Sequence, residues 1–294
     1  MKDYNEGLTL GFVGAGTTGT ALALSLWHCG YRIVGVSSRS IGSAQRLAGM
    51  VDGCKVYEKA QQVADAAQLV FITTPDDVIA RVAQEIQWRG GQYVVHCSGA
   101  HSVDILEPAY RAGAITGSFH PLQTFASIEQ AIKNIHGSVF GIEAEEPLRG
   151  LLKKMAEALN GKPVILRAED KVLYHAAAVF ACNYLVTLVK LATDLWQTFG
   201  VSQQQATKAL LPLLQGTLNN IGNVGLPNCL TGPIARGDLG TIRRHLDALE
   251  KVAPSILSTY KEMGLQTVPI ALAKGRVDQA RAKEMEVLLG KKGG

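Results

Sequence analysis

Short apolar runs alternate with amphipathic segments along the first 167 residues. The apolar runs predict strands over 8–13, 31–36, 54–57, 68–73, 92–97, 114–119, 137–142 and 163–166. The segments between them predict helices over 18–29, 41–48, 59–66, 76–87, 103–112 and 147–159. Strands that alternate with helices at this spacing indicate right-handed βαβ units and a mostly parallel sheet.

The pattern changes near residue 167. Beyond it the sequence predicts helices only, over 169–199, 202–221, 238–263, 267–274 and 276–289, with a loop rich in Asn, Gly and Pro at 219–228. We therefore expect an α/β domain at 1–167 and an all-α domain at 168–294.

Residues 172–189 form a mostly apolar stretch without charge, at the lower limit of membrane-spanning length. His175 and Asn183 interrupt this stretch, and Lys171 and Lys190 bracket it. These residues favour a helix in a protein core or a dimer interface over a membrane helix. We expect a homodimer through the C-terminal helices and no membrane association; a membrane anchor would instead make solubility depend on detergent.

The composition narrows the class of protein. The 294 residues are 47% hydrophobic and 18% charged, which is typical of a globular protein and excludes a disordered one. The net charge of +4 is too small and too scattered for a nucleic-acid binder. The five cysteines lack metal-ligand spacing, and the first residues are not those of a secretory signal. We therefore expect reduced thiols, no metal and a cytoplasmic location.

A glycine-rich loop follows the first expected strand. In Gly14-Ala-Gly16-Thr17-Thr18-Gly19, the first glycine permits a tight turn, the second admits a pyrophosphate and the third lets the helix pack on the strand. The start of that helix offers N–H groups and a positive dipole end to phosphates. With a strand before it and a helix after it, the motif predicts a Rossmann-type dinucleotide site rather than a merely structural turn.

The end of the second expected strand indicates which dinucleotide binds. NAD enzymes place an acid there to hold the ribose 2′-OH, but this chain has Ser38, Arg39 and Ser40. Two hydroxyls and a guanidinium suit a 2′-phosphate, so we predict NADP(H); an ordinary polar turn is the alternative. The missing acid also counts against a methyltransferase that uses S-adenosylmethionine.

Polar residues follow other strands at the sheet edge where ligands bind. Thr74 and Pro75 should border the cofactor, although the acids beside them would also cap the next helix. Ser98, His101 and His120 should lie toward the nicotinamide. A histidine near a hydride-transfer centre can donate the proton that an alkoxide needs. The alternative for His120 is a strand-end histidine bonded to the backbone.

The first long helix begins with a polar edge. Lys171 and His175 are four residues apart and share a helix face, and Asn183 lies two turns further on. We expect this edge to face an interdomain cleft, where Lys171 can bind the reacting oxygen and stabilise its charge. The alternatives are a solvated first turn for Lys171 and a core amide for Asn183.

A segment rich in turn residues precedes the third long helix. Within it, Arg236 offers a bidentate clamp for a substrate carboxylate, and Thr231 lies nearby. Asp238 is expected to cap the helix.

Taken together, these motifs resemble one bacterial family. The resemblance spans essentially the whole chain and rests on the glycine-rich loop, Thr73–Asp76, Ser118–Thr124, Tyr174–Ala178 with Asn183, and Thr231–Asp238. This family comprises Rossmann-like NADP oxidoreductases with a C-terminal domain of unknown function. It is similar to the group that contains pyrroline-5-carboxylate reductase, ketopantoate reductase and the β-hydroxyacid dehydrogenases. The resemblance implies a helical dimerisation domain and a catalytic Lys-x-x-x-Asn; Lys171 matches the lysine, but His175 stands in place of the asparagine.

We therefore predict an NADP(H)-dependent oxidoreductase that transfers hydride to or from a small carbonyl or imine, with a substrate carboxylate held by Arg236 or Ser98. The candidate catalytic residues are Lys171, His175 and His120, and the candidate substrate-binding residues are Ser98, Asn183, Thr231 and Arg236. The alternative is a non-catalytic NADP-binding redox sensor or dimeric scaffold, which has no need of polar side chains that converge near the nicotinamide.

Overall fold

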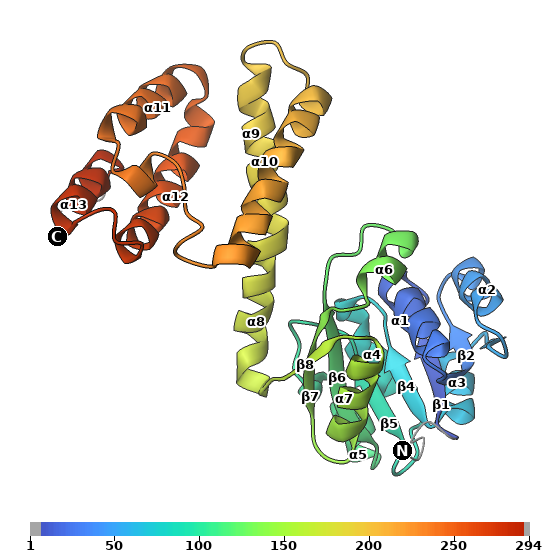
Figure 1. Ribbon diagram of the computed structural model, residues 1–294. Coiled ribbons are helices and arrows are strands. Elements are labelled where there is room, and N and C mark those ends of the chain that lie inside the picture. Colours follow the sequence, from blue (N-terminus) through green and yellow to red (C-terminus); the bar gives the residue numbers. More distant parts are fainter. Residues whose placement is uncertain (1–6, 291–294) are drawn as a thin grey trace. The chain divides into compact units, whose positions relative to one another are not determined.

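The structure, a computed structural model, describes residues 7–290, which form two compact units that divide between Cys182 and Asn183 (Figure 1). The first unit contains an eight-stranded sheet in the order β3-β2-β1-β4-β5-β6-β7-β8. Its strands are β1 (Thr9–Val13), β2 (Arg32–Ser37), β3 (Lys55–Val56), β4 (Leu69–Ile72), β5 (Tyr93–His96), β6 (Ile115–Leu122), β7 (Val139–Ala144) and β8 (Lys162–Ile165). All neighbours are parallel except β6 and β7, so the expected mostly parallel sheet is confirmed.

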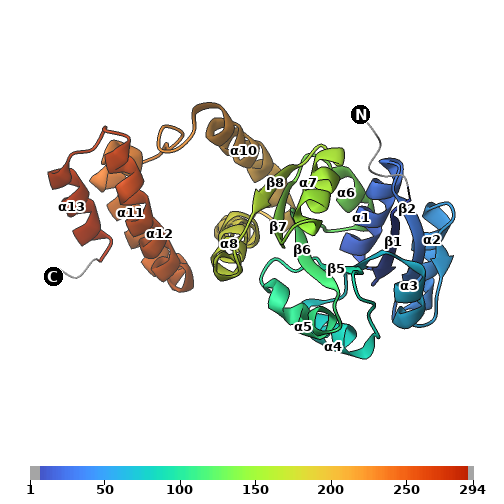
Figure 2. The same ribbon diagram turned by 90° about the horizontal axis from the view of Figure 1, so that it is seen from below.

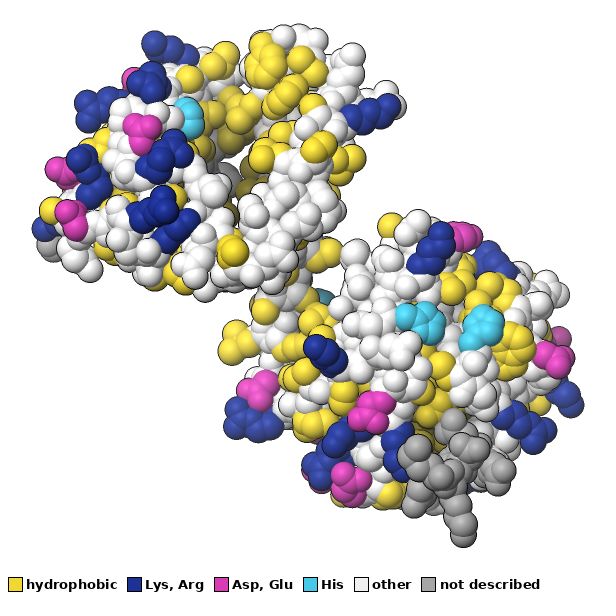
Figure 3. All heavy atoms as spheres, in the orientation of Figure 1, with side chains coloured by type: hydrophobic (Ala, Val, Ile, Leu, Met, Phe, Trp, Pro, Cys, Tyr) yellow, Lys and Arg dark blue, Asp and Glu magenta, His cyan; other side chains and the backbone are white. Residues whose placement is uncertain are grey.

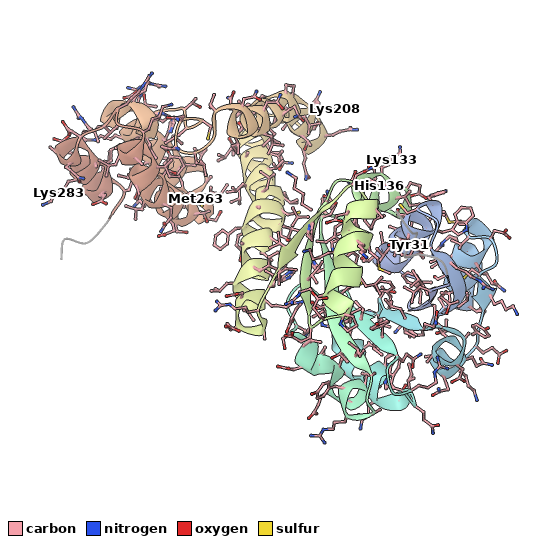
Figure 4. All side chains as sticks on the ribbon, turned by 60° about the horizontal axis from the view of Figure 1, so that its bottom comes forward. Tyr31, Lys133, His136, Lys208, Met263 and Lys283 are labelled. Carbon is pink, nitrogen blue, oxygen red and sulfur yellow. The ribbon has the colours of Figure 1, made fainter. Side chains whose placement is uncertain are left out.

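Helices cover both faces of this sheet (Figure 2). One apolar core contains residues of α1 (Thr17–His28), α2 (Ile41–Met50), α6 (Ile128–Asn134) and α7 (Leu148–Ala158). A second core contains residues of α3 (Ala60–Ala66), α4 (Asp76–Glu85), the 3₁₀ turn η1 (Val103–Leu106) and α5 (Glu107–Arg111). Side-chain burial follows this layering: Tyr31 is buried before β2, whereas Lys133 and His136 are exposed at α6 and just after it (Figure 4).

The sheet differs from expectation around β6. The strand predicted to end at residue 119 continues to Leu122, because β7 pairs with it in antiparallel register and places His120 opposite Gly141. His120 is therefore a strand residue and does not lie in a loop. Helix α6 was not predicted from the sequence, and the single helix predicted over 103–112 is instead η1 followed by α5.

A long helical segment follows the sheet. It contains the 3₁₀ turn η2 (Ala168–Asp170), α8 (Lys171–Ala178), a π-helical turn (Val179–Asn183) and α9 (Tyr184–Gln197). The last strand ends at Ile165, close to the expected boundary at residue 167. The division by packing comes later, between residues 182 and 183, because α8 packs against β6 and β7 through Lys171 and Tyr174.

The second unit continues with α10 (Gln203–Val224), the 3₁₀ turn η4 (Ile234–Arg236), α11 (Leu239–Val252), α12 (Pro254–Ala273) and α13 (Gln279–Leu288). Two boundaries were predicted wrongly. The loop expected from residue 219 begins only after Val224. The helix expected over 238–263 breaks before Pro254, because proline lacks an N–H and fits the first turn of a new helix. That helix, α12, continues through Pro269 in its interior and so absorbs the segment expected over 267–274.

Helical residues Ala168–Gln197 are long and apolar enough to span a membrane by length and composition, with a mean hydropathy of 1.7 over the most apolar window. The beginning of this segment packs inside the first unit, however, where Lys171 is fully buried. Apolar side chains gather over α9 and α10 (Figure 3). We call the exposed large side chains of these two helices the apolar face; it includes Val186, Leu188, Leu211, Leu213, Leu218 and Val224.

Candidate functional site

The glycine-rich loop joins β1 to α1 at the carboxyl edge of the sheet. Gly14 has φ +113°, and a Cβ there would lie 2.7 Å from the Thr73 backbone. A Cβ on Gly19 would lie 2.5 Å from Thr73 Oγ1 and 2.6 Å from the Gly14 carbonyl oxygen. Gly16 is exposed, and a Cβ there would meet nothing within 4 Å. Gly14 and Gly19 therefore serve the fold, whereas the open side of Gly16 leaves room for a phosphate group against the backbone.

The turn after β2 lies beside this loop, since the Gly14 N–H donates to the Ser37 carbonyl oxygen at 2.8 Å. Ser38 is half-buried, while Arg39 and Ser40 are exposed. The Ser40 hydroxyl caps α2 by accepting from the Ser43 N–H at 3.4 Å. The turn thus presents a guanidinium and hydroxyl groups, without a carboxylate, next to the glycine-rich loop.

The loop after β4 lies against the glycine-rich loop. Thr73 Oγ1 donates to the Gly14 carbonyl oxygen at 2.8 Å and so joins the two loops. Thr74 Oγ1 is buried and has no hydrogen-bond partner among the described residues. Pro75 is exposed and precedes Asp76, the first residue of α4.

Ser98, after β5, is the centre of a hydrogen-bond network. Its hydroxyl donates to Asp76 Oδ2 at 2.7 Å and accepts from the N–H groups of Ala100 at 3.3 Å and His101 at 3.2 Å. Ser98 is buried, whereas the His101 side chain is exposed. The network holds the β5 loop against the start of α4, at the edge that also carries the glycine-rich loop.

Lys171 is buried beneath this network. Its ammonium donates to the Ser98 carbonyl oxygen at 3.0 Å and to Ser118 Oγ at 2.7 Å, and it lies 4.0 Å from Glu143 Oε2. Lys171 is 0% exposed, and burial lowers the pKa of its ammonium to about 8. Burial likewise raises the pKa of Glu143, whose Oε2 accepts from the Val103 N–H at 3.0 Å. The solvated first turn considered for Lys171 is therefore wrong, and all of these partners belong to the first unit.

Three aromatic rings meet above Gly99. His120 Nδ1 and the Tyr174 hydroxyl are 2.9 Å apart, and the His175 ring lies 6.2 Å from the His120 ring. A Cβ on Gly99 would lie 2.8 Å from both His120 Nε2 and His175 Nδ1. Any side chain at this position would therefore clash with the two histidine rings as they are placed. Burial, aided by the charge of Lys171 and by the neighbouring His175 ring, lowers the pKa of His120 to about 4. His175 Nδ1 is buried without a hydrogen-bond partner among the described residues.

The remaining candidates lie in the second unit. Asn183 ends the π-helical turn, and its carbonyl oxygen accepts from Thr187 Oγ1 at 3.5 Å. Thr231 and Arg236 are exposed. Asp238 caps α11 by accepting from the Thr241 N–H at 2.9 Å, as expected from the sequence. The substrate contacts assigned to Asn183, Thr231 and Arg236 stay predictions.

Three parts of the site were not predicted from the sequence: Glu143, Gly99, and the contact between Tyr174 and His120. An acid that continues the apolar run of β7 is a signal that could have pointed to Glu143. The other two arise from contacts between distant segments of the chain. Among residues 7–290, His, Cys, Asp and Glu form no group of three or more that could hold a metal ion.

The fold and the geometry of the glycine-rich loop define a Rossmann-type domain, which a helical region follows in the chain. A Rossmann-like family model matches residues 4–121, and the domain of unknown function DUF2520 matches residues 138–267. The protein TM1727 from Thermotoga maritima is 30% identical, with 91% of this chain and 100% of that chain covered and a TM-score of 0.73. The chain belongs to the family of that protein, with a Rossmann-like domain followed by DUF2520.

Two further solved structures fit this assignment. A "putative NADP oxidoreductase" from Bacteroides fragilis is 26% identical over 89% of this chain and 98% of its own, with a TM-score of 0.73. A pyrroline-5-carboxylate reductase from Coxiella burnetii shares the fold at 18% identity, covering 94% of this chain and 97% of its own, with a TM-score of 0.58. No curated protein matches the chain in sequence. The expected family and fold class are confirmed, and these two names fall within the expected enzyme class.

Proposed function

We propose that the protein is an NADPH-dependent reductase of a small carbonyl or imine substrate. The observation that carries this proposal is a single sheet edge with two parts: a glycine-rich loop open at Gly16, and the histidine nitrogens that converge above Gly99. The relatives support it, since one is named as an NADP oxidoreductase and another as a reductase whose named substrate, pyrroline-5-carboxylate, is an imine with a carboxylate.

The described residues fit NADP(H). Gly14, Gly16, Thr17, Thr18 and Gly19 would hold the pyrophosphate at the start of α1, and Thr74 with Pro75 would border the nicotinamide side. Ser38, Arg39 and Ser40 would bind the 2′-phosphate, because a guanidinium attracts it and no carboxylate in that turn repels it. When bound, the nicotinamide supplies the hydride.

The residues of the first unit divide into two roles. His120 and His175, beside Gly99, would face the oxygen or nitrogen of the substrate, where charge changes as the hydride arrives. Lys171 is fully buried and contacts the Ser98 carbonyl oxygen, so we assign it a positioning role beneath the site and not the direct contact expected from the sequence. Ser98 already donates to Asp76, which orders the loop that carries Gly99.

The cofactor assignment predicts that NADPH binds at least ~10-fold more tightly than NADH, a difference of about 1.4 kcal/mol. Nicotinamide fluorescence during titration of the purified protein measures both affinities. Arg39→Ala should abolish the preference by weakening NADPH alone. Arg32→Ala is the matched control, since Arg32 is exposed at the opposite end of β2.

Preference for NADH would contradict the role of Ser38, Arg39 and Ser40, and binding of neither dinucleotide would contradict the oxidoreductase proposal as a whole. A redox sensor or scaffold would bind NADPH without turnover. A screen of keto acids and imines for NADPH oxidation separates the two functions, because only a reductase oxidises NADPH when its substrate is added. A sensor also has no need of a histidine pair beside the nicotinamide.

We also propose that the apolar face forms a homodimer interface. Val186 on α9 is 68% exposed and Leu213 on α10 is 66% exposed, within a larger group of exposed apolar side chains. Contiguous apolar surface of this kind marks an interaction site, and a second copy of the chain carries the same surface. Lys190 and Asp194 pair on α9 at 2.6 Å, which is unfavourable in a lipid core.

The dimer proposal predicts that Val186→Asp with Leu213→Asp converts a dimer into a monomer. Light scattering after size-exclusion chromatography measures the mass. Val287→Asp on α13, where the side chain is 65% exposed, is the control and should leave the dimer intact. A wild-type protein that is monomeric without detergent would overturn the proposal, as would a dimer that survives both substitutions.

A further inference from the structure

We propose that Tyr174 is a positioning residue that fixes the tautomer of His120, so that neutral His120 presents its Nε2–H to the substrate as a hydrogen-bond donor. This inference deepens the proposed function and rests on it for the identity of the acceptor, a carbonyl oxygen or imine nitrogen. The hydrogen bond between the two side chains is a property of the free protein, so it can be tested separately.

A glycine on β7, Gly141, makes the contact between Tyr174 and His120 possible. Tyr174 reaches from α8 across Gly141, where a Cβ would lie 2.8 Å from the Tyr174 hydroxyl oxygen. Gly141 is also the register partner of His120 on β6. The tyrosine hydroxyl therefore arrives 2.9 Å from His120 Nδ1, with the two rings nearly perpendicular at 86°.

The direction of this hydrogen bond follows from the surroundings of the hydroxyl. Burial raises the pKa of Tyr174 to about 12, so the group keeps its proton. The Gly141 backbone acts on the same oxygen in the direction that lowers its pKa, as an N–H that faces it does, so we assign the hydroxyl proton to the bond with His120 Nδ1. An Nδ1 that accepts a hydrogen bond carries no proton in the neutral ring, so the proton is on Nε2.

The neutral form of His120 is favoured by the groups around it. Burial is the largest cause that lowers its pKa to about 4, and the positive charge of Lys171 and the neighbouring His175 ring act in the same direction, whereas Asp76 opposes them. The Nε2–H then lies on the Gly99 side of the ring, close to His175 Nδ1. A neutral imidazole N–H can stabilise negative charge that develops on a substrate oxygen without first giving up a proton.

The experiment compares Tyr174→Phe with Tyr260→Phe. The chain contains a second pair of the same geometry, in which His245 Nδ1 and the Tyr260 hydroxyl are 2.8 Å apart with rings at 82°, in the second unit. Tyr260→Phe thus removes a matched hydrogen bond elsewhere. Nitrogen-15 NMR of the histidine rings reports the tautomer of His120 in both variants, and steady-state kinetics with NADPH reports kcat and KM.

We expect His120 in the wild type and in Tyr260→Phe to carry its proton on Nε2, with Nδ1 as a hydrogen-bonded acceptor. In Tyr174→Phe the Nδ1 signal should lose that character as the tautomer with its proton on Nδ1 becomes populated, and the pKa of His120 should rise because the neutral form loses a donor. The value of kcat should fall about 10-fold, with KM changing less than about 2-fold. His120→Gln, which keeps an amide N–H near the Nε2 position, should retain more activity than His120→Asn.

An unchanged His120 tautomer in Tyr174→Phe would overturn the inference, as would an Nδ1–H ring in the wild type. Full kcat in Tyr174→Phe, measured on a confirmed substrate, would overturn it too. If Tyr174→Phe does not fold, Gly141→Ala gives a second test, since its methyl group would displace the hydroxyl while the tyrosine stays. If the tautomer is as stated but no substrate oxidises NADPH, the proposed function fails and the role of Tyr174 in the free protein stands.

Discussion

Lys171→Met should lower the free energy of unfolding by about 3 kcal/mol, because it removes one partner of a buried ionic pair and leaves the other without its counter-charge. Methionine fills the aliphatic volume but donates to neither the Ser98 carbonyl oxygen nor Ser118 Oγ. Urea unfolding followed by circular dichroism measures the loss. Lys133→Met is the control, since Lys133 is exposed on α6 and should change stability by less than about 0.5 kcal/mol.

A double-mutant cycle with Glu143→Gln tests whether the pair is the cause. Glutamine can still accept the Val103 N–H but carries no charge, so Lys171→Met should be less harmful in the Glu143→Gln background. Equal effects of Lys171→Met in both backgrounds would contradict the pairing of Lys171 with Glu143.

The pH dependence of the same substitution has a definite sign. The pKa of Lys171 is lowered from 10.5 to about 8 by burial, so between these values the unfolded chain binds more protons at this site than the folded chain. The free energy of unfolding of the wild type therefore rises with pH through this window, relative to Lys171→Met. The difference between the two proteins should be larger near pH 10 than at pH 7. A difference that stays constant would place the ammonium in solvent, and one that shrinks would mean that the folded protein raises the pKa of Lys171.

The strands of the first unit could be predicted because each is a short apolar run between turn residues, and their identity does not depend on distant contacts. His120 illustrates the limit of this reasoning. Its sequence neighbour Pro121 indicates the end of a strand, yet β6 continues because β7 returns alongside it in antiparallel register. That pairing decides which residue His120 faces, and no local pattern contains it.

The burial of Lys171 shows the same limit within the site. A lysine in the first turn of a helix is usually solvated. Here Ser98, Ser118 and Glu143, from three separate segments, surround its ammonium. The sequence could identify Lys171 as a candidate, but only the packing of α8 on the sheet shows that it lies beneath the site.

Gly16→Ala should weaken NADPH binding about 100-fold and leave the fold intact. The loss of affinity is expected because the pyrophosphate has to approach the backbone closely at this position. Gly16 has φ −75° and ψ −170°, an extended conformation that alanine adopts, and a Cβ there meets no atom within 4 Å in the free protein. Because alanine restricts the unfolded chain more than glycine does, the free energy of unfolding should stay constant or rise by about 0.5 kcal/mol. The added methyl group would occupy the space assigned to a phosphate oxygen.

Gly19→Ala and Gly49→Ala are the controls for this loss of affinity. Gly19→Ala adds a methyl group that clashes within the fold, and Gly49→Ala adds one that meets no other atom. Gly19→Ala should destabilise the fold by about 2 kcal/mol, because its Cβ would press on Thr73 Oγ1 and on the Gly14 carbonyl oxygen. Gly49→Ala, within α2, meets no atom within 4 Å; it should leave NADPH binding unchanged and keep the free energy of unfolding constant or raise it by up to about 1 kcal/mol. Fluorescence titration and urea unfolding of all three variants then distinguish the roles, since only Gly16→Ala should lose affinity at full stability. Tight NADPH binding by Gly16→Ala would mean that the pyrophosphate does not lie against this loop, and the cofactor site would have to be sought elsewhere on the sheet edge.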